Sequence, residues 1–276
     1  MYNILIDKFK KLNLLEKIKD KRKIKLNKNK FFISYKEALE YCENNTKNAY
    51  ENINLSKYRF EKTNNFLSNN ENILKAPFAP LLMFVINLFL TKFEGKTPSF
   101  IDFGGACGES IILLKKLFGD EIQKKSWIIE SPQIVKESKE WKFTENINFS
   151  SQLMDVVSEN KIDIFFTSGT IQSIENPYEI ISNLARSNIP FIALTRNNFA
   201  ENEIISAQIS RLSDNGIGSH LEKYKDELIY YPNTTIIKKT IIDLFKENGY
   251  SLLFDSKNNT NINKTESGGD LVFLKI

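Results

Sequence analysis

The sequence of 276 residues has few of the side chains that metal sites and disulfide frameworks require. It contains two cysteines, Cys42 and Cys107, and one histidine, His220. Two cysteines cannot form a disulfide framework, and one histidine excludes a multi-histidine metal site, so we expect no metal. With 11 glycines and 7 prolines, the chain is neither collagen-like nor of low complexity. A hydrophobic content of 41% is enough for a folded core.

Long hydrophobic runs are also missing. The most apolar stretch, residues 76–91, has no charged residue but contains Pro77, Pro80 and Asn87. A membrane-spanning helix needs about 20 apolar residues, so this stretch is predicted to be a buried helix that starts near Pro80. The N-terminus has no apolar signal-peptide core, and the cysteines are expected to be free thiols. These features predict a cytoplasmic protein.

The net charge is small and unevenly distributed. The chain carries 38 basic and 34 acidic residues, a net charge of +4. Residues 1–30 alone hold eleven basic and three acidic residues, so this leader has a net charge of +8 and the rest of the chain −4. A body of this charge argues against a nucleic-acid partner. The basic leader is either a solvated helix that packs on the body or an amphipathic helix that associates peripherally with anionic lipid.

The periodicity of the chain changes near residue 97. Residues 1–96 are predicted to be a helical segment with a capping box at Ser34 and Glu37 and a loop at 64–72. Afterwards short apolar runs alternate with segments of helical length. The predicted strands are 99–103, 126–130, 147–149, 162–167, 190–194, 252–254 and 271–274, and the predicted helices are 108–118, 133–140, 152–159, 177–186 and 235–248. Residues 97–276 are therefore expected to form one α/β domain. Its sheet should be Rossmann-like, doubly wound, seven-stranded and mainly parallel, with an antiparallel C-terminal edge strand.

Ligands of such a sheet bind beyond the carboxyl ends of the strands. The first predicted strand ends in an acid that is followed by a turn rich in small residues: Asp102, Gly104, Gly105, Ala106 and Gly108. The dinucleotide fingerprint G-x-G-x-x-G is broken here, because Ala106 and Glu109 stand where its second and third glycines belong. An acid beside glycines would repel a pyrophosphate and attract a cation. The turn therefore favours S-adenosylmethionine (SAM) over NAD, unless it is a glycine-rich turn without a ligand.

The next strands supply further candidates for cofactor binding. Glu130 ends the second strand, 26 residues after Gly104, roughly where a ribose-binding acid belongs. The alternative is a solvated carboxylate. The remaining candidates are small residues at strand ends: Ser131, Ser150 and Ser151, of which the last two could flank the adenine, and Thr167, Ser168 and Gly169, which could line the methionine end of SAM and the acceptor.

These motifs resemble those of class I SAM-dependent methyltransferases. More closely, the chain resembles a family of methyltransferases encoded in bacterial capsule and O-antigen loci. The matching stretches, within residues 31–255, are SYKEAL at 34–39, IDFGG at 101–105, IIE at 128–130, SGTIQSIENP at 168–177, RNNF at 196–199 and YP at 231–232. The resemblance implies methyl transfer from SAM without naming an acceptor. The sequence departs from the family pattern at Ala106, at Ser131 and at the Asn197–Asn198 pair.

A connection of 40 residues, 195–234, joins the fifth strand to the last large helix. Usual connections have about 2–6 residues, so we expect this one to cap the acceptor site. By intrinsic pKa His220 is the best general-base candidate, unless it is a surface histidine. Arg196 could bind an anionic acceptor such as a sugar phosphate, nucleotide sugar or phosphoramidate, or could form a plain ion pair. Tyr231, before Pro232, could shape the pocket or donate a hydrogen bond to the acceptor, or it could simply pack against its neighbours.

The predicted activity is that of a SAM-dependent O-methyltransferase. Its acceptor would be a surface-polysaccharide precursor, methylated either on a sugar hydroxyl or on a phosphoryl or phosphoramidate oxygen. Two alternatives remain open at this point: a SAM-binding regulatory protein without turnover, and a nucleotide-sugar oxidoreductase. The sequence leaves the oligomeric state open.

Overall fold

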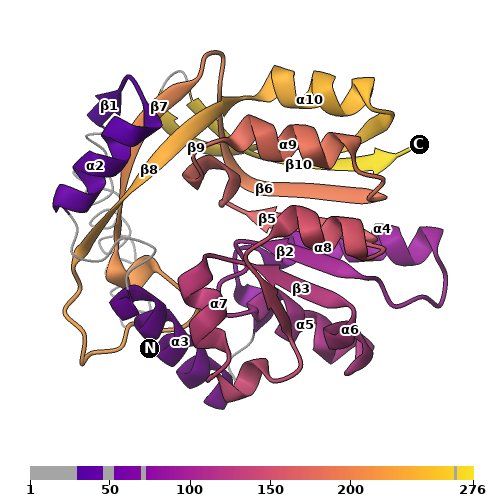
Figure 1. The fold of residues 1–276 in the computed structure, drawn as a ribbon, viewed down its shortest axis with the longest axis horizontal. Helices are drawn as coiled ribbons and strands as arrows, with labels where there is room; N and C mark the ends of the chain where they lie inside the picture. The colour runs from indigo at the N-terminus through magenta and orange to yellow at the C-terminus, as the bar shows by residue number, and fades with distance from the viewer. Residues whose placement is uncertain (1–29, 46–52, 70–72, 264–265) are drawn as a thin grey trace, which may run out of the picture.

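The computed structural model describes residues 30–45, 53–69, 73–263 and 266–276 (Figure 1). The predicted basic leader lies outside the described residues, except for Lys30. Helices cover both faces of one central sheet, and a smaller antiparallel extension carries the segment that precedes residue 46. Within these ranges, no helix is long and apolar enough to cross a membrane.

Ten described strands form one sheet, and seven of them make its central part in the order β4-β3-β2-β5-β6-β10-β9. Their bounds are β2 (Phe100–Phe103), β3 (Ser126–Ile129), β4 (Asn148–Ser150), β5 (Ile164–Ser168), β6 (Phe191–Ala200), β9 (Tyr250–Asn263) and β10 (Glu266–Lys275). Strands β2 to β6 are parallel, and β10 is antiparallel to both of its neighbours. The order reverses between β2 and β5, which confirms the predicted doubly wound, Rossmann-like sheet. The antiparallel C-terminal pair is also confirmed, with β9 at its outer side.

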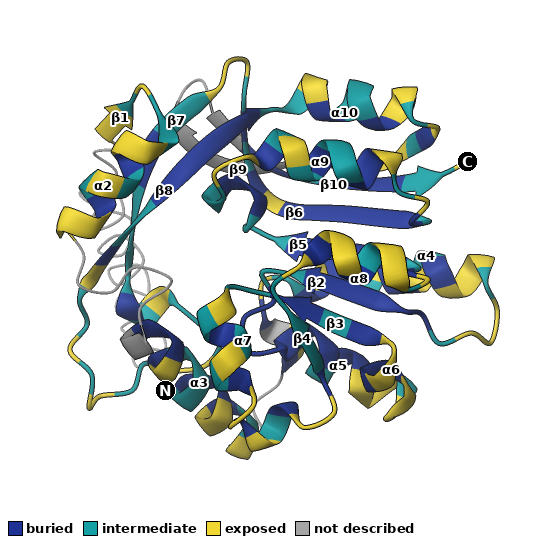
Figure 2. Cartoon of the chain, in the orientation of Figure 1, coloured by how far each residue is buried: buried dark blue, intermediate teal, exposed yellow. Residues whose placement is uncertain are grey.

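Helices bury the sheet on both faces, and this explains the continuous apolar runs of its strands. In β5, Ile164 and Phe166 pack on one side with α4 (Ala79–Lys92) and α5 (Glu109–Phe118). Phe165 packs on the other side, where α8, α9 and α10 supply the partners. Figure 2 shows the strands as a buried layer between these helices. The remaining helices are α6 (Glu121–Lys124), α7 (Pro132–Ser138), α8 (Leu153–Glu159), α9 (Pro177–Arg186), α10 (Lys238–Glu247), η1 (Ile73–Lys75), η2 (Lys142–Thr144), η3 (Ile171–Ser173) and η4 (Leu212–Asp214).

The long connection after the fifth predicted strand is largely β structure. Strands β7 (Ile204–Arg211) and β8 (Leu228–Ile237) pair antiparallel, and β8 joins the last two residues of β6. Figure 1 shows both strands leaving the central sheet and running past α2 toward α3. We call β7, β8 and the loop 212–227 between them the cap. The helix predicted from residue 235 begins only at Lys238, because the β-branched run that precedes it belongs to β8.

The segment before residue 97 is mostly helical, but its first described residues form a strand. β1 (Lys30–Phe32) pairs with β7, which corrects the purely helical prediction. In α2 (Tyr35–Asn45), the Glu37 N–H donates to Ser34 Oγ at 3.2 Å, as the predicted capping box requires. α3 extends over Ile53–Ser68, so the loop predicted at 64–72 is wrong for residues 64–68, where Phe66 is buried in the core. α4 begins at Ala79 and confirms the predicted buried helix.

Candidate functional site

The turn after β2, residues 104–108, lies at the point where the strand order reverses, and we call it the cofactor loop. Gly104 has a φ of 74°, and a Cβ there would lie 1.9 Å from Thr170 Oγ1. Only glycine therefore allows the loops after β2 and β5 to meet this closely. Ala106 also has positive φ, at 52°, and Gly108 immediately precedes α5. The first turn of α5 offers backbone N–H groups at this edge of the sheet.

Asp102 lies beneath the cofactor loop instead of beside an open surface. Its side chain is buried and accepts a hydrogen bond from the Ser110 hydroxyl. A Cβ on Gly105 would lie 2.6 Å from Asp102 Cγ, so the loop passes directly over the carboxylate. Burial raises the pKa of Asp102 to about 7, Ser110 opposes the shift, and the Glu109 and Glu130 carboxylates add to it. Asp102 thus supports the loop and contributes to a concentration of acidic groups around it.

Glu130 connects the cofactor loop to the end of β3. Its Oε1 accepts from the Ala106 N–H at 2.9 Å, and its Oε2 accepts from the Ser131 N–H at 3.0 Å. A carboxylate offers about four acceptor positions, so both oxygens retain capacity for ligand hydroxyls. Ser131 is the N-cap of α7, where its hydroxyl accepts from the Ile134 N–H at 3.4 Å. The structure thus brings Glu130, Ser131 and Ala106 together, as expected of a single ligand site.

The other small residues lie at the ends of β4 and β5. The Ser150 hydroxyl accepts from the Gln152 N–H at 3.0 Å, and Ser151 follows it half-buried. Thr167 is fully buried and donates to the Phe103 carbonyl at 2.9 Å, which makes it a link between β5 and β2. Ser168 Oγ is buried without a partner in the described part of the chain. Gly169 donates its N–H to the Thr195 carbonyl at 2.9 Å and starts the loop that reaches the cofactor loop.

Arg196 occupies a β-bulge of β6, where β6 and β10 lose register. Its φ of 57° lies in the left-handed region, which costs a non-glycine residue about 1–2 kcal/mol. The bulge is stabilised by Asp270, whose Oδ1 accepts from Thr195 Oγ1 at 2.6 Å and from the Arg196 N–H at 2.8 Å. The Arg196 side chain is exposed at the carboxyl edge of the sheet, and a Cβ on Gly169 would lie 3.7 Å from the Arg196 carbonyl oxygen. A strained arginine held at this edge is a candidate for ligand binding.

One face of the cap carries polar side chains toward α3 and β6. Tyr231 packs with Ile229 and Tyr58 of α3, and Gln208 lies opposite Tyr231 in the β7–β8 register. Asn233 is on the same face by strand alternation, and its Oδ1 accepts from Asn198 Nδ2 at 3.4 Å. Gln208 Oε1 is buried without a hydrogen-bond partner in the residues described. We call this the inner face of the cap.

Sequence reasoning missed Gln172, which joins the two parts of this site. Along β6, the pairing with β5 ends at Thr195 and the pairing with β8 starts at Phe199. In the gap, Gln172 Oε1 accepts from the Asn198 N–H at 2.6 Å. The motif at 168–177 contained this residue, but no spacing rule indicates that a glutamine side chain accepts the backbone hydrogen bond that a neighbouring strand would otherwise accept. The neighbouring Asn197 is fully buried, and its amide atoms have no partner in the described ranges.

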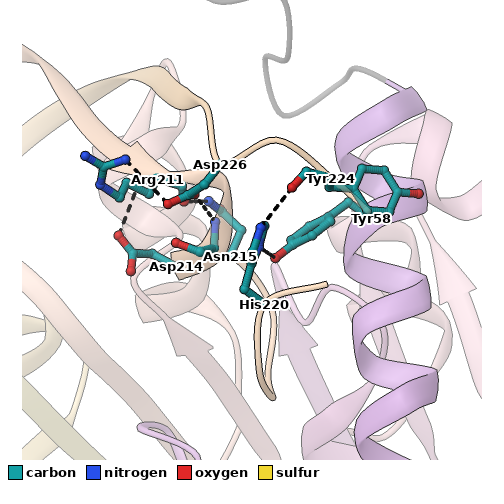
Figure 3. A network of polar contacts seen from close by, with 8 residues as sticks. Tyr58, Arg211, Asp214, Asn215, His220, Tyr224 and Asp226 are labelled. Carbon is teal, nitrogen blue, oxygen red and sulfur yellow. Dashed lines mark hydrogen bonds and ion pairs between the residues drawn. The ribbon is translucent and has the colours of Figure 1, made fainter. Parts of the chain in front are cut away.

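His220 lies in the cap loop and is bonded on both ring nitrogens (Figure 3). Nδ1 is 2.8 Å from the Tyr58 hydroxyl and Nε2 is 2.9 Å from the Tyr224 carbonyl oxygen. The carbonyl can only accept, so Nε2 carries the proton and Nδ1 accepts from Tyr58. Neither nitrogen is open to a proton from an acceptor in this arrangement. In this arrangement His220 links the cap to α3, and its role as general base stays a prediction.

No family model and no curated protein matches this sequence. Among solved structures, a SAM-dependent methyltransferase from Clostridium acetobutylicum is similar with 11% identity and a TM-score of 0.46, over 78% of this chain and 97% of that chain. The magnesium protoporphyrin IX methyltransferase from Synechocystis, solved with bound SAH, has 13% identity and a TM-score of 0.43, over 71% and 82%. A glycopeptide N-methyltransferase has 8% identity and a TM-score of 0.42, over 73% and 99%. These scores are below 0.5, so the Rossmann-like assignment rests on the chain's own strand order.

Proposed function

We propose that this chain is a SAM-dependent methyltransferase whose acceptor is an oxygen of a surface-polysaccharide precursor. The observation that carries the proposal is the Glu130 carboxylate, which is bonded to the cofactor loop at 2.9 Å beside the buried Asp102 and Glu109. The Glu109 and Glu130 carboxylates add to the raised pKa of Asp102, and a cationic ligand would relieve this repulsion. SAM carries an ammonium and a sulfonium group and no phosphate, so its charge suits the site. The proposal is compatible with the solved methyltransferase structures described above.

The residues divide between holding the cofactor and holding the acceptor. Glu130 would accept hydrogen bonds from ribose hydroxyls, and Ser168 and Gly169 at the end of β5 would line the methionine end, where Ser168 Oγ has no partner among the described residues. SAM, when bound, supplies an electrophilic methyl group on a sulfonium. The protein's contribution is then alignment of the acceptor oxygen with that methyl, an effect worth up to about 7–11 kcal/mol.

On the acceptor side, the proposal favours an anionic oxygen. Arg196 presents a guanidinium at the carboxyl edge of the sheet, and Gln208 presents a buried, unpartnered amide oxygen from the inner face of the cap. This combination suits a phosphorylated, hydroxyl-rich molecule such as a sugar phosphate or nucleotide sugar. A neutral hydroxyl acceptor would need a general base, and His220 is already bonded on both nitrogens. A phosphoryl-type oxygen is already charged and needs none.

Calorimetric titration with SAM, S-adenosylhomocysteine (SAH) and NAD tests the cofactor. We expect micromolar binding of SAM and SAH and none of NAD. Glu130→Ala should weaken SAH binding at least about tenfold, because two charged hydrogen bonds are lost. Glu159→Ala, at the exposed end of α8, is the matched control and should bind as the wild type does. Tighter binding of NAD than of SAM would support the oxidoreductase alternative and overturn the proposal.

The acceptor is tested by SAH release with a panel of sugar phosphates and nucleotide sugars. Turnover should depend on a phosphorylated member of the panel. Arg196→Gln should raise the KM for that acceptor about tenfold or more, since a charged hydrogen bond is lost, and leave SAM binding unchanged. If SAM binds but every member of the panel remains unmethylated, the chain is a SAM-binding protein without this activity.

A further inference from the structure

Helix α3 lies between the cofactor loop and the cap loop and makes hydrogen bonds toward both. Tyr58, Glu61 and Lys62 are spaced at i, i+3 and i+4, so they share one face of the helix, and this face meets the cap loop. Thr63 is on the neighbouring face and reaches α5 at the base of the cofactor loop. Two adjacent residues of one helix thus contact the cap loop and the first residue of α5, next to the cofactor loop.

Lys62 binds the cap loop through backbone carbonyls. Its side chain is 2% exposed, and Nζ donates to the carbonyl oxygens of Ser213 at 2.7 Å, Asn215 at 3.0 Å and Gly216 at 3.1 Å. An ammonium group has three protons, so these three bonds satisfy it completely. A displaced cap loop would leave a buried cation unpaired, which is costly. The position of this loop is therefore tied to α3.

Two further contacts extend the attachment along the cap loop. Glu61 Oε2 binds Lys223 Nζ at 2.7 Å and accepts from the Tyr224 hydroxyl at 2.9 Å. Tyr58 bonds His220, as Figure 3 shows. The same figure shows Arg211 and Asp226 at the base of the loop, where Asp226 Oδ1 accepts from the Ser213 N–H at 2.9 Å. The loop is thus held at its base and along its length.

The contact with the cofactor loop runs through a buried carboxylate. Thr63 Oγ1 donates to Glu109 Oε1 at 2.8 Å, and Glu109 Oε2 accepts from the Cys107 N–H at 3.2 Å. Glu109 is buried, and burial raises its pKa while the Arg59 guanidinium on α3 opposes the shift. The carboxylate therefore accepts one hydrogen bond from α3 and one from the cofactor loop, and so connects the two.

We propose that Lys62 and Thr63 are positioning residues that couple cofactor binding to the ordering of the cap loop. A ligand that fixes the cofactor loop fixes Glu109, Glu109 fixes Thr63 and α3, and Lys62 transmits this order to residues 213–216. Cofactor binding would then further stabilise the cap loop that α3 holds in place. This inference rests on the proposed function, because it needs SAM or SAH to bind the cofactor loop.

Hydrogen–deuterium exchange of the full chain, with and without saturating SAH, tests the coupling. Peptides that cover residues 211–216 and 221–226 should exchange about fivefold more slowly with SAH, the lower range for a coupled site. Calorimetry on the same samples reports SAH binding separately. The measured quantity is the SAH-dependent difference, which a purely structural role of α3 would not produce.

Two variants separate the links. Lys62→Met keeps the length of the side chain and removes the ammonium, so SAH should bind within about twofold of wild type while the SAH-dependent protection of the cap loop disappears. Thr63→Val removes the hydroxyl that bonds Glu109 and Cys107 and should weaken both SAH binding and the protection. Lys57→Met, an exposed lysine of α3, and Thr91→Val, an exposed threonine of α4, are the matched controls and should behave as wild type.

The two proposals fail in different ways. If the wild type binds SAH and exchange in the cap loop does not change, the coupling is wrong and the cofactor assignment stands. The coupling is also wrong if Lys62→Met keeps the full SAH-dependent protection. If the wild type does not bind SAH, the proposed function is wrong, and the coupling is rejected with it. The wild-type measurement decides the matter even if a buried variant does not fold.

Discussion

Arg196 combines an unfavourable backbone conformation with an exposed, charged side chain. Its φ of 57° suits glycine, and Asp270 supplies the hydrogen bonds that hold it there. We expect Arg196→Gly to be more stable than Arg196→Ala by about 1 kcal/mol, because both remove the side chain and only glycine relieves the strain. Urea denaturation at neutral pH measures this difference. An alanine variant as stable as the glycine variant would show that the bulge is unstrained.

Asp102 should make the stability of the protein depend on pH. Burial raises its pKa to about 7, well above the value of 3.8 for a free side chain. Between these values the folded state keeps a proton that the unfolded chain has lost. Stability should therefore fall as pH rises from about 4 to 7, with a slope of at most about 1.4 kcal/mol per pH unit. Asp102→Asn cannot titrate and should flatten this slope in urea denaturation at pH 5, 6, 7 and 8.

A surface variant controls for the general effect of charge on stability. Asp155→Asn, on the exposed side of α8, should keep the wild-type pH dependence. Part of the slope should also remain in Asp102→Asn, because burial raises the pKa of Glu109 as well. Equal slopes for wild type and Asp102→Asn would mean that Asp102 is already ionised at low pH.

At the scale of elements, the Gln172 side chain in η3 accepts a backbone hydrogen bond from a part of β6 that lies between its pairings with β5 and β8. It fills the gap along β6 between β5 and β8 by accepting from the Asn198 N–H. Gln172→Ala leaves that part-buried N–H without its acceptor and should cost about 1–3 kcal/mol of unfolding free energy. Gln152→Ala, at an exposed position before α8, is the control and should cost less than about 0.5 kcal/mol. A Gln172→Ala variant within that same limit would show that β6 and β8 need no such link.

The same elements show how far the sequence determines the fold. The strands of the central sheet were predictable because both of their faces are buried, so that Ile164 to Phe166 forms a continuous apolar run. The cap strands were not, because one of their faces is polar and, within the described ranges, β7 and β8 pair only with each other, with β1 and with the tip of β6. Asp102 and Glu130 beside the cofactor loop were predictable, because each stands at or next to the end of an apolar strand. The role of Lys62 did not, because an isolated lysine on a polar helix gives no signal of burial.

For the whole molecule, the distribution of charge leads to the last prediction, which concerns the leader. Residues 1–30 have a net charge of +8, and the first described residues after them include Phe31 and Ile33, which are 59% and 92% exposed. Basic residues beside exposed apolar side chains suit a surface of anionic lipid. We expect the full chain to sediment with vesicles that contain phosphatidylglycerol and not with neutral phosphatidylcholine vesicles, and to dissociate as salt rises.

The test compares two sets of four substitutions. Changing Lys21, Arg22, Lys23 and Lys25 to Gln should reduce vesicle binding at least about tenfold, since each basic residue near an anionic surface contributes about 1 kcal/mol. Changing the exposed body lysines Lys115, Lys116, Lys124 and Lys136 to Gln removes the same charge elsewhere and should have little effect. If both sets weaken binding equally, the attraction belongs to the net charge of the molecule. The leader would then have no specific part in membrane binding.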